Sequence, residues 1–143
     1  MNRHISPLLV LFLLAGCASA PQTPAVAVIG TVADQERFAG LWRGSLDAVD
    51  DREDGPLEFR LSAGTGTLLT RLAPGAGRIL WVRVNGATLS GAVEARWDER
   101  CQCDVYTTFE ATLEDSELRG TLRRREKLLW HDVGTWTAVR VTE

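Results

Sequence analysis

Beyond residue 40 the sequence alternates apolar and polar side chains with a period of two, and this pattern constrains the fold more than any other feature. From Leu89 to Trp97, for example, the odd-numbered positions are apolar or small, and polar residues such as Ser90 and Glu94 stand between them. Such alternation is typical of half-buried β-strands. Turn-forming residues interrupt it about every ten residues, as in antiparallel sandwiches and barrels.

The turns divide the chain into eight expected strands. They span residues 41–48, 57–62, 66–72, 78–84, 88–97, 104–113, 117–125 and 134–141. Asn85-Gly86 is the strongest hairpin signal, because both residues tolerate the positive φ of a type I′ turn. Consecutive strands joined by tight turns form an antiparallel meander, and closing the meander into a barrel removes its open edges. We therefore predict an all-β fold, an eight-stranded antiparallel up-and-down barrel, with a small sandwich as the alternative.

The N-terminal segment has the layout of a secretory signal. A basic start, Asn2-Arg3-His4, precedes an apolar run from Ile5 to Leu14, which is about half as long as a transmembrane helix. Leu14-Ala15-Gly16-Cys17 resembles the lipobox of bacterial lipoproteins, in which a peptidase cuts before the cysteine and the cysteine carries lipid. The resemblance implies a signal peptide at 1–16, a lipid anchor on Cys17 and, with Ala18 next, an envelope protein sorted to the outer membrane.

Residues 17–33 then form the lipidated N-terminus and a tether, because Pro21 and Pro24 stand among small residues and valines. The remaining stretch, 34–143, has the length of one domain with a single core. The chain carries 16 basic and 19 acidic side chains, a formal net charge of −3. This mixed balance argues against nucleic acid as a partner and offers no polybasic face for anionic lipid. The basic run 123–125 is interpreted as a solvated strand edge, with contact to an acidic partner as the alternative.

Two short motifs resemble the lipocalin and calycin signature. Phe38-Ala39-Gly40-Leu41-Trp42 is similar to the Gly-x-Trp at the start of the first strand, and Trp136-Thr137-Ala138-Val139-Arg140 is similar to the segment that carries a basic residue late in the last strand. The resemblance implies a calycin-like barrel preceded by a short helix, here at 34–38. It also implies that Arg140 packs on Trp42 and closes the bottom of the barrel, a structural role for both residues.

An up-and-down barrel places alternate loops at the same end, and the loops opposite the termini carry the chemically suggestive side chains. These are Asp47, Asp50, Asp51, Glu53 and Asp54 after the first strand, Cys101 and Cys103 after the fifth, and Trp130, His131 and Asp132 before the last. Because Cys17 leads into the other end, we expect these loops to point away from the membrane. The acidic group lacks the ligand spacing of an EF-hand, so a solvated turn accounts for it better than a calcium site.

Once Cys17 is lipidated, Cys101 and Cys103 are left as an even pair in an oxidising compartment. Residues at i and i+2 of an extended strand are too far apart to bridge easily, but they approach each other at a hairpin tip. A disulfide that staples the turn is one interpretation. A soft-metal or redox site with His131 as a third ligand is another, and an intermolecular bridge or free thiols complete the alternatives.

The sequence contains no Gly-x-Ser-x-Gly, His-Glu-x-x-His or Gly-rich phosphate loop, so we expect a protein without enzymatic activity or cofactor. Two functions stay open. In the first, the barrel binds a small apolar or amphipathic ligand, with Trp81, Trp97 and Phe109 as candidate wall residues. In the second, it is a protein-interaction module, such as a hydrolase inhibitor or an envelope-stress sensor, whose contact surface includes Trp130 and the Cys-x-Cys loop.

Overall fold

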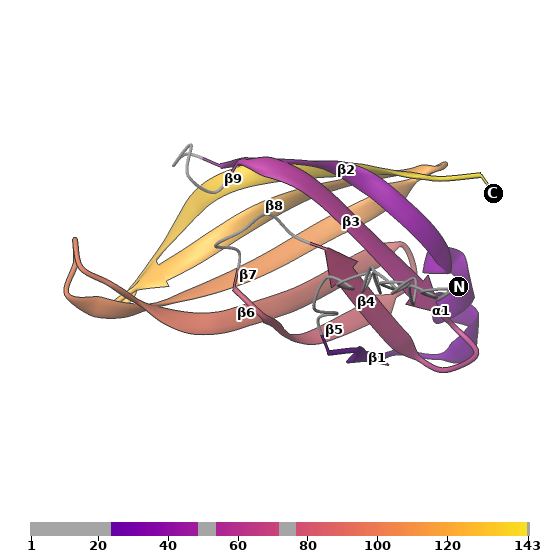
Figure 1. Cartoon of the computed structure of the whole chain (residues 1–143), viewed down its shortest axis with the longest axis horizontal. Helices are drawn as coiled ribbons and strands as arrows, with labels where there is room; N and C mark the ends of the chain where they lie inside the picture. The colour runs from indigo at the N-terminus through magenta and orange to yellow at the C-terminus, as the bar shows by residue number, and fades with distance from the viewer. Residues whose placement is uncertain (1–23, 49–53, 72–76, 143) are drawn as a thin grey trace, which may run out of the picture.

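The computed structural model describes residues 24–48, 54–71 and 77–142, and within these ranges nine strands close into a barrel with one short helix at its end (Figure 1). From the N-terminus the elements are β1 (Val26–Ile29), α1 (Val32–Phe38), β2 (Gly40–Ala48), β3 (Gly55–Ser62), β4 (Thr67–Arg71), β5 (Ile79–Asn85), β6 (Thr88–Asp98), β7 (Cys103–Glu114), β8 (Glu117–Glu126) and β9 (Leu129–Arg140). Around the barrel their order is β1-β4-β3-β2-β9-β8-β7-β6-β5. In the part of the chain that the structure describes, no helix is long and apolar enough to cross a bilayer.

Strands β2 to β9 correspond to the eight expected strands, and the prediction of an all-β barrel is confirmed. The last strand returns to the first long one, so that Trp42 of β2 lies opposite Arg140 of β9. β9 begins at Leu129 rather than at 134, because its N-terminal half continues the pairing with β8 past a register shift. Trp130 and His131 therefore lie in a strand. The prediction that they belong to a loop is wrong.

The prediction of eight antiparallel strands is wrong in one respect, because β1 fills the gap between β4 and β5. Val26 lies opposite Leu68 in an antiparallel pair, and Val28 lies opposite Val82 in a parallel pair. The barrel therefore has nine strands with mixed pairing. β1 falls within the range assigned to the tether, where the β-branched residues of 26–29 suit a strand that covers two open edges.

Helix α1 covers one end of the barrel, and its own side chains hold it there. It begins after Thr31, whose hydroxyl accepts a hydrogen bond from the N–H of Asp34 at 3.1 Å. The buried amide of Gln35 donates to the carbonyl oxygens of Val28 at 3.3 Å and of Gly30 at 3.1 Å. These bonds fix the turn between β1 and α1, so the short strand and the helix form one unit.

The end of the barrel beneath α1 is closed by large side chains. Phe38 and Trp42 are fully buried there, and Nε1 of Trp42 donates to the carbonyl oxygen of Phe38 at 2.8 Å. The guanidinium carbon of Arg140 lies 4.8 Å from the centre of the Trp42 ring, and Arg140 also donates to the carbonyl oxygen of Arg37. This is the contact that the calycin resemblance implies, and it joins the helix to both ends of the meander.

From this closed end a line of aromatic rings continues into the interior. Trp42 stacks on Phe59 with ring centres 6.0 Å apart and planes at 13°. Phe59 meets Trp136 edge to face at 6.5 Å, and Trp136 meets Phe109 in the same way at 6.4 Å. The rings therefore tie β2, β3, β7 and β9 together across the barrel.

Replacing Trp42 by Ala is expected to lower the free energy of unfolding by about 3–5 kcal/mol, because it leaves a cavity where the ring was fully buried. Urea denaturation followed by far-ultraviolet circular dichroism measures the change. The matched control is Trp97→Ala, whose ring is 57% exposed, with an expected change within about 0.5 kcal/mol. Equal losses in the two variants would show that the closed end does not carry the stability assigned to it.

Candidate functional site

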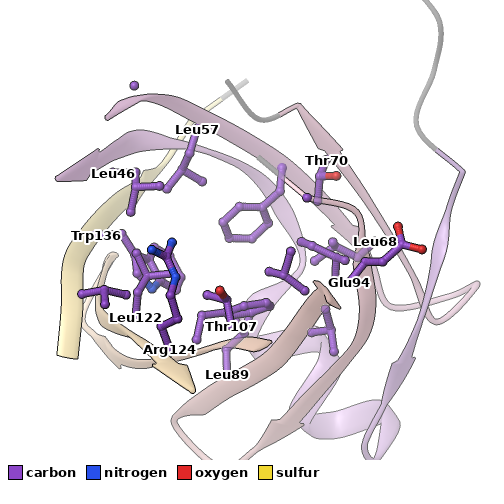
Figure 2. A pocket seen from close by; sticks show the side chains of 18 of the residues that line it. Leu46, Leu57, Leu68, Thr70, Leu89, Glu94, Thr107, Leu122, Arg124 and Trp136 are labelled. Atoms are coloured by element: carbon purple, nitrogen blue, oxygen red, sulfur yellow. The ribbon is translucent and has the colours of Figure 1, made fainter. Parts of the chain in front are cut away.

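The end of the barrel opposite α1 is hollow. A cavity of about 140 Å³ lies among the mouth-side halves of the strands and opens at that end (Figure 2). Its wall consists mainly of leucine, valine and isoleucine side chains, with the rings of Phe59, Phe109 and Trp136 among them. An apolar wall of this kind excludes ions and favours apolar groups.

Two glycines make room for the rings in this wall. Gly120 lies opposite Trp136, and Gly91 lies opposite Phe109, each on the neighbouring strand. A Cβ atom on Gly120 would come within 2.3 Å of Nε1 of Trp136, and one on Gly91 within 2.2 Å of Cζ of Phe109. Each ring therefore lies flat over a neighbouring backbone, and the space on its other side stays open.

One charged side chain is buried among the apolar ones. Arg124, near the end of β8, lines the cavity with 4% of its surface exposed, and Figure 2 shows its side chain projecting into the barrel. A guanidinium keeps its charge in any protein environment. Burial of a charge among apolar groups costs free energy unless other groups compensate it, and Arg124 interacts electrostatically with Asp98. The site thus combines an apolar cavity with a fixed positive charge near its mouth.

The sequence interpretation of 123–125 as a solvated edge overlooked Arg124. A signal for it was present, because Leu118, Gly120, Leu122 and Arg124 follow one another with a period of two. The first three face the interior, and the same alternation turns Arg124 inward. Its neighbours in the run, on the opposite face of the strand, point outward.

A bulge in β6 changes which of its side chains reach the cavity. Val93 lies opposite Thr107, but Arg96 lies opposite Val105, so the strand holds one extra residue between them. The prediction that Trp97 lines the wall is therefore wrong, because the bulge turns this ring to the solvent, while Arg96 lines the cavity.

Glu94, which the bulge brings to the rim, points its carboxylate away from the centre of the cavity in Figure 2. The Glu94 carboxylate also lies 3.3 Å from the guanidinium of Arg78 at the surface. Thr70 and Thr107 line the cavity as well and add neutral hydroxyl groups. The polar part of the wall is thus dominated by cationic and neutral groups.

The other candidate contact residues divide between the cavity and the outer surface. Phe109 lines the cavity, but Trp81 does not, because the register of β5 shifts between Ile79 and Trp81. Trp81 lies instead beside Arg83, whose guanidinium carbon is 5.7 Å from the ring centre. Trp130 is exposed on the outer face of β9.

Cys101 and Cys103 form a disulfide at the tip of the β6–β7 hairpin, with their Cα atoms 5.2 Å apart. Gln102 between them has a φ of 48°, a left-handed conformation that folds the chain back and brings the two residues together. The turn staple is thus the arrangement present, and His131 is exposed in β9 opposite Arg124. In residues 24–48, 54–71 and 77–142, no group of three or more His, Cys, Asp or Glu side chains is placed to hold a metal ion.

Several predicted features fall outside the described residues. They are the signal peptide, the lipobox with Cys17, and the acidic side chains Asp50, Asp51 and Glu53. At the described edges of the acidic loop, Asp47 is exposed at the end of β2 and the Asp54 carboxylate accepts a hydrogen bond from the N–H of Ala48. Asp132, the last of the predicted loop residues, lies in β9 and pairs with Arg123 at 3.2 Å.

Asp98 is held at the mouth by the hairpin that follows it. Its carboxylate accepts hydrogen bonds from the guanidinium of Arg100 at 3.0 Å and from the backbone N–H of Arg100 at 2.8 Å. These bonds, with a smaller electrostatic effect of Arg124, lower the pKa of Asp98 to about 2. The Asp98 carboxylate therefore stays charged over the whole physiological range.

Comparison with protein-family models, with curated proteins and with solved structures finds no match to this chain. The function therefore has to be inferred from the chemistry of the site. An open apolar cavity can hold an apolar group of matching size, and the buried guanidinium of Arg124 can pair with an anion. Both features meet at the mouth of one barrel.

The low pKa of Asp98 predicts a pH-dependent contribution to stability. Because the folded pKa of about 2 lies below the unfolded value of roughly 3.9, the contribution is present above the unfolded pKa and is lost as pH falls through the folded one. Carbon-13 NMR titration of the carboxyl group is expected to show this midpoint, and Arg100→Gln is expected to raise it. Arg43→Gln, on another face, should leave it unchanged, and a shift in that control would contradict the assignment.

Proposed function

We propose that the protein is a non-enzymatic binding protein that holds one small amphipathic molecule in its barrel. The apolar body of the ligand occupies the cavity, and its anionic group lies at Arg124. The observation that carries this proposal is a buried guanidinium at the open end of an apolar cavity. The same combination distinguishes the ligand from purely apolar molecules and from free anions.

The size of the cavity limits the apolar part of the ligand. An apolar cavity of about 150 Å³ in another protein stays dry and binds benzene. The present cavity of about 140 Å³ is similar in size, so a ring or a short alkyl chain fits inside it. Transfer of such a group from water gains about 25 cal/mol for each Å² of apolar surface that is buried.

The guanidinium of Arg124 accounts for the anionic group. Arginine offers two parallel N–H donors to a carboxylate or phosphate, and such charge-assisted bonds are about twice as strong as neutral ones. Inside an apolar wall the attraction is stronger than in water, because the local dielectric constant is lower. A carboxylate or phosphate at the mouth also keeps its remaining oxygen lone pairs accessible to water.

We further propose that this binding protein is anchored at the cell envelope through lipidated Cys17, with the outer membrane as its site. The lipobox-like residues Leu14-Ala15-Gly16-Cys17 after a short apolar run support the anchor. In the producing cell, Cys17→Ser is expected to move the protein from the membrane fraction to the soluble periplasmic fraction. Mass spectrometry of the N-terminal peptide should show a lipid on Cys17, and an unmodified peptide would contradict the anchor.

Octanoate and octan-1-ol test the binding site, because they share an alkyl chain and differ in charge. Both are expected to change the fluorescence of the protein, since Trp136 lines the cavity. Arg124→Met is expected to weaken octanoate binding about tenfold or more and to leave octan-1-ol within about twofold. Leu57→Trp, which fills the cavity, should abolish both.

The matched control for this titration is Arg83→Met, an exposed arginine on the outer face of β5. It should bind both ligands as the wild type does. If neither ligand binds the wild type, the proposed function is wrong. If Arg124→Met weakens both ligands equally, the cavity binds apolar molecules without the anionic preference.

A further inference from the structure

The β8–β9 hairpin ends in two leucines. The two-residue turn is Lys127-Leu128, and β9 begins directly after it at Leu129. Leu128 is 91% exposed and Leu129 is 66% exposed. Hairpin turns usually carry Gly, Asn, Asp or Ser, and Lys127 adopts the left-handed conformation with a φ of 57° without being one of these. The most projecting point of this hairpin is therefore apolar, against the usual chemistry of a turn.

Behind the pair of Glu126 and Leu129 that closes the turn, aromatic and basic side chains stand in the next rows of the hairpin. Arg125 lies opposite both Tyr106 and Trp130 in the sheet, and its guanidinium carbon is 4.5 Å from the Tyr106 ring centre and 5.7 Å from that of Trp130. Arg123 lies 5.8 Å from the Trp130 ring centre and also pairs with the Asp132 carboxylate at 3.2 Å. An apolar tip followed by a belt of Trp, Tyr and Arg has the polarity order of a membrane interface, from acyl chains to headgroups.

The first described strand, β1, runs away from the mouth of the barrel. β5 starts at the mouth, where Ile79 lines the cavity, and runs toward the closed end. β1 is parallel to β5, with Val28 opposite Val82, so β1 also runs from the mouth side toward the closed end. Cys17 itself lies outside the described residues, so the end of the barrel into which it leads stays a prediction.

The distance from the anchor to the barrel is short. Residues 18–25 separate Cys17 from Val26, and eight residues span at most about 29 Å when fully extended. A lipid on Cys17 would therefore hold the barrel close to the membrane surface. Figure 1 shows the β6–β7 and β8–β9 hairpins together at the end opposite α1.

We propose that the β8–β9 tip docks on the surface of an anionic phospholipid bilayer and turns the mouth of the barrel toward the membrane. Leu128 and Leu129 enter the acyl region, while Trp130, Arg125 and Lys127 lie among the headgroups. The charge of the whole chain concealed this local excess, because residues 123–132 carry four basic side chains against the two acidic ones of Glu126 and Asp132. This inference goes beyond the proposed ligand binding and does not depend on it.

The shape of the tip favours a bilayer over a protein as its partner. A stable protein interface buries about 800 Å² on each side, which requires a broad complementary surface. A two-residue turn presents a narrow convex point instead. A fluid bilayer accepts such a point without complementary shape. The affinity of the tip for the bilayer then increases with the apolar area that is inserted and with the attraction of basic side chains to anionic lipid.

Sedimentation with vesicles tests the docking on a chain that has no lipid of its own. All described strands and their core lie within residues 26–140, so a chain that begins at residue 18 keeps the complete barrel. It is expected to sediment with vesicles of one part phosphatidylglycerol to two parts phosphatidylcholine. Leu128→Ser/Leu129→Ser is expected to lower the partition coefficient about tenfold or more, because two exposed leucines no longer insert.

Two variants serve as controls, and circular dichroism verifies that each is folded. Val32→Ser/Val139→Ser removes two apolar side chains, 63% and 54% exposed, at the closed end, and it should bind as the wild type does. Leu57→Trp fills the cavity and should also keep vesicle binding, because docking does not require capture of a lipid molecule.

Four results would overturn the proposal. The first is a wild-type chain that stays in the supernatant or binds pure phosphatidylcholine equally well, because the basic belt would then contribute nothing. The second is an equal loss of binding in the Val32→Ser/Val139→Ser control. The third is a loss of binding in Leu57→Trp, which would indicate lipid capture in the barrel. The fourth is a wild-type dimer that Leu128→Ser/Leu129→Ser converts to a monomer without vesicles, which would make the tip a protein interface.

Discussion

Closure of the sheet depends on the hydrogen bonds of a four-residue strand. Without β1, the neighbouring edges of β4 and β5 would expose unpaired N–H and C=O groups, and the barrel would be an open, curved sheet. β1 pairs with both edges, antiparallel on one side and parallel on the other. Gln35 of α1 donates hydrogen bonds to the carbonyl oxygens of Val28 in β1 and of Gly30 in the turn after it. The strand that closes the wall and the helix that closes the bottom are therefore held together.

The interior of the barrel is filled differently in its two halves. In the closed half, Phe38 and Trp42 occupy the interior completely, and Arg140 covers the Trp42 ring. In the open half, large rings also face inward, but glycines opposite them let the rings lie against the wall. The interior of a barrel of this size can be filled by side chains or can hold one small ligand. In this barrel, side chains fill the closed half and a cavity lies in the open half.

Much of the fold could be predicted from the sequence, because alternation and turn residues are local signals. The meander follows from such patterns, the calycin resemblance implied the contact of Arg140 with Trp42, and the Cys101–Cys103 bridge was one of several alternatives for the cysteine pair. The position of Trp97 could not be predicted, because a single extra residue in β6 reverses the face of every later side chain. Such a bulge depends on how two strands pair, which alternation within one strand does not report.

The candidate site was harder to predict than the fold. Three consecutive arginines are indistinguishable by composition, and they hid the alternation of Leu118, Gly120, Leu122 and Arg124 that turns Arg124 inward. β1 was missed because prolines at 21 and 24 suggested a tether, while the valines after them carried the opposite signal. Tertiary pairing with two open edges decided between these local preferences.

The position of β1 also has a mechanical consequence. Any pull on the N-terminal segment reaches the barrel first through Val26, whose strand is held by few hydrogen bonds. If β1 peeled away under such a load, the wall would part along a seam between β4 and β5. Leu68 and Val82, which line the cavity, flank that seam. Tension in the tether and retention of whatever the barrel holds would then be mechanically coupled through a single short strand.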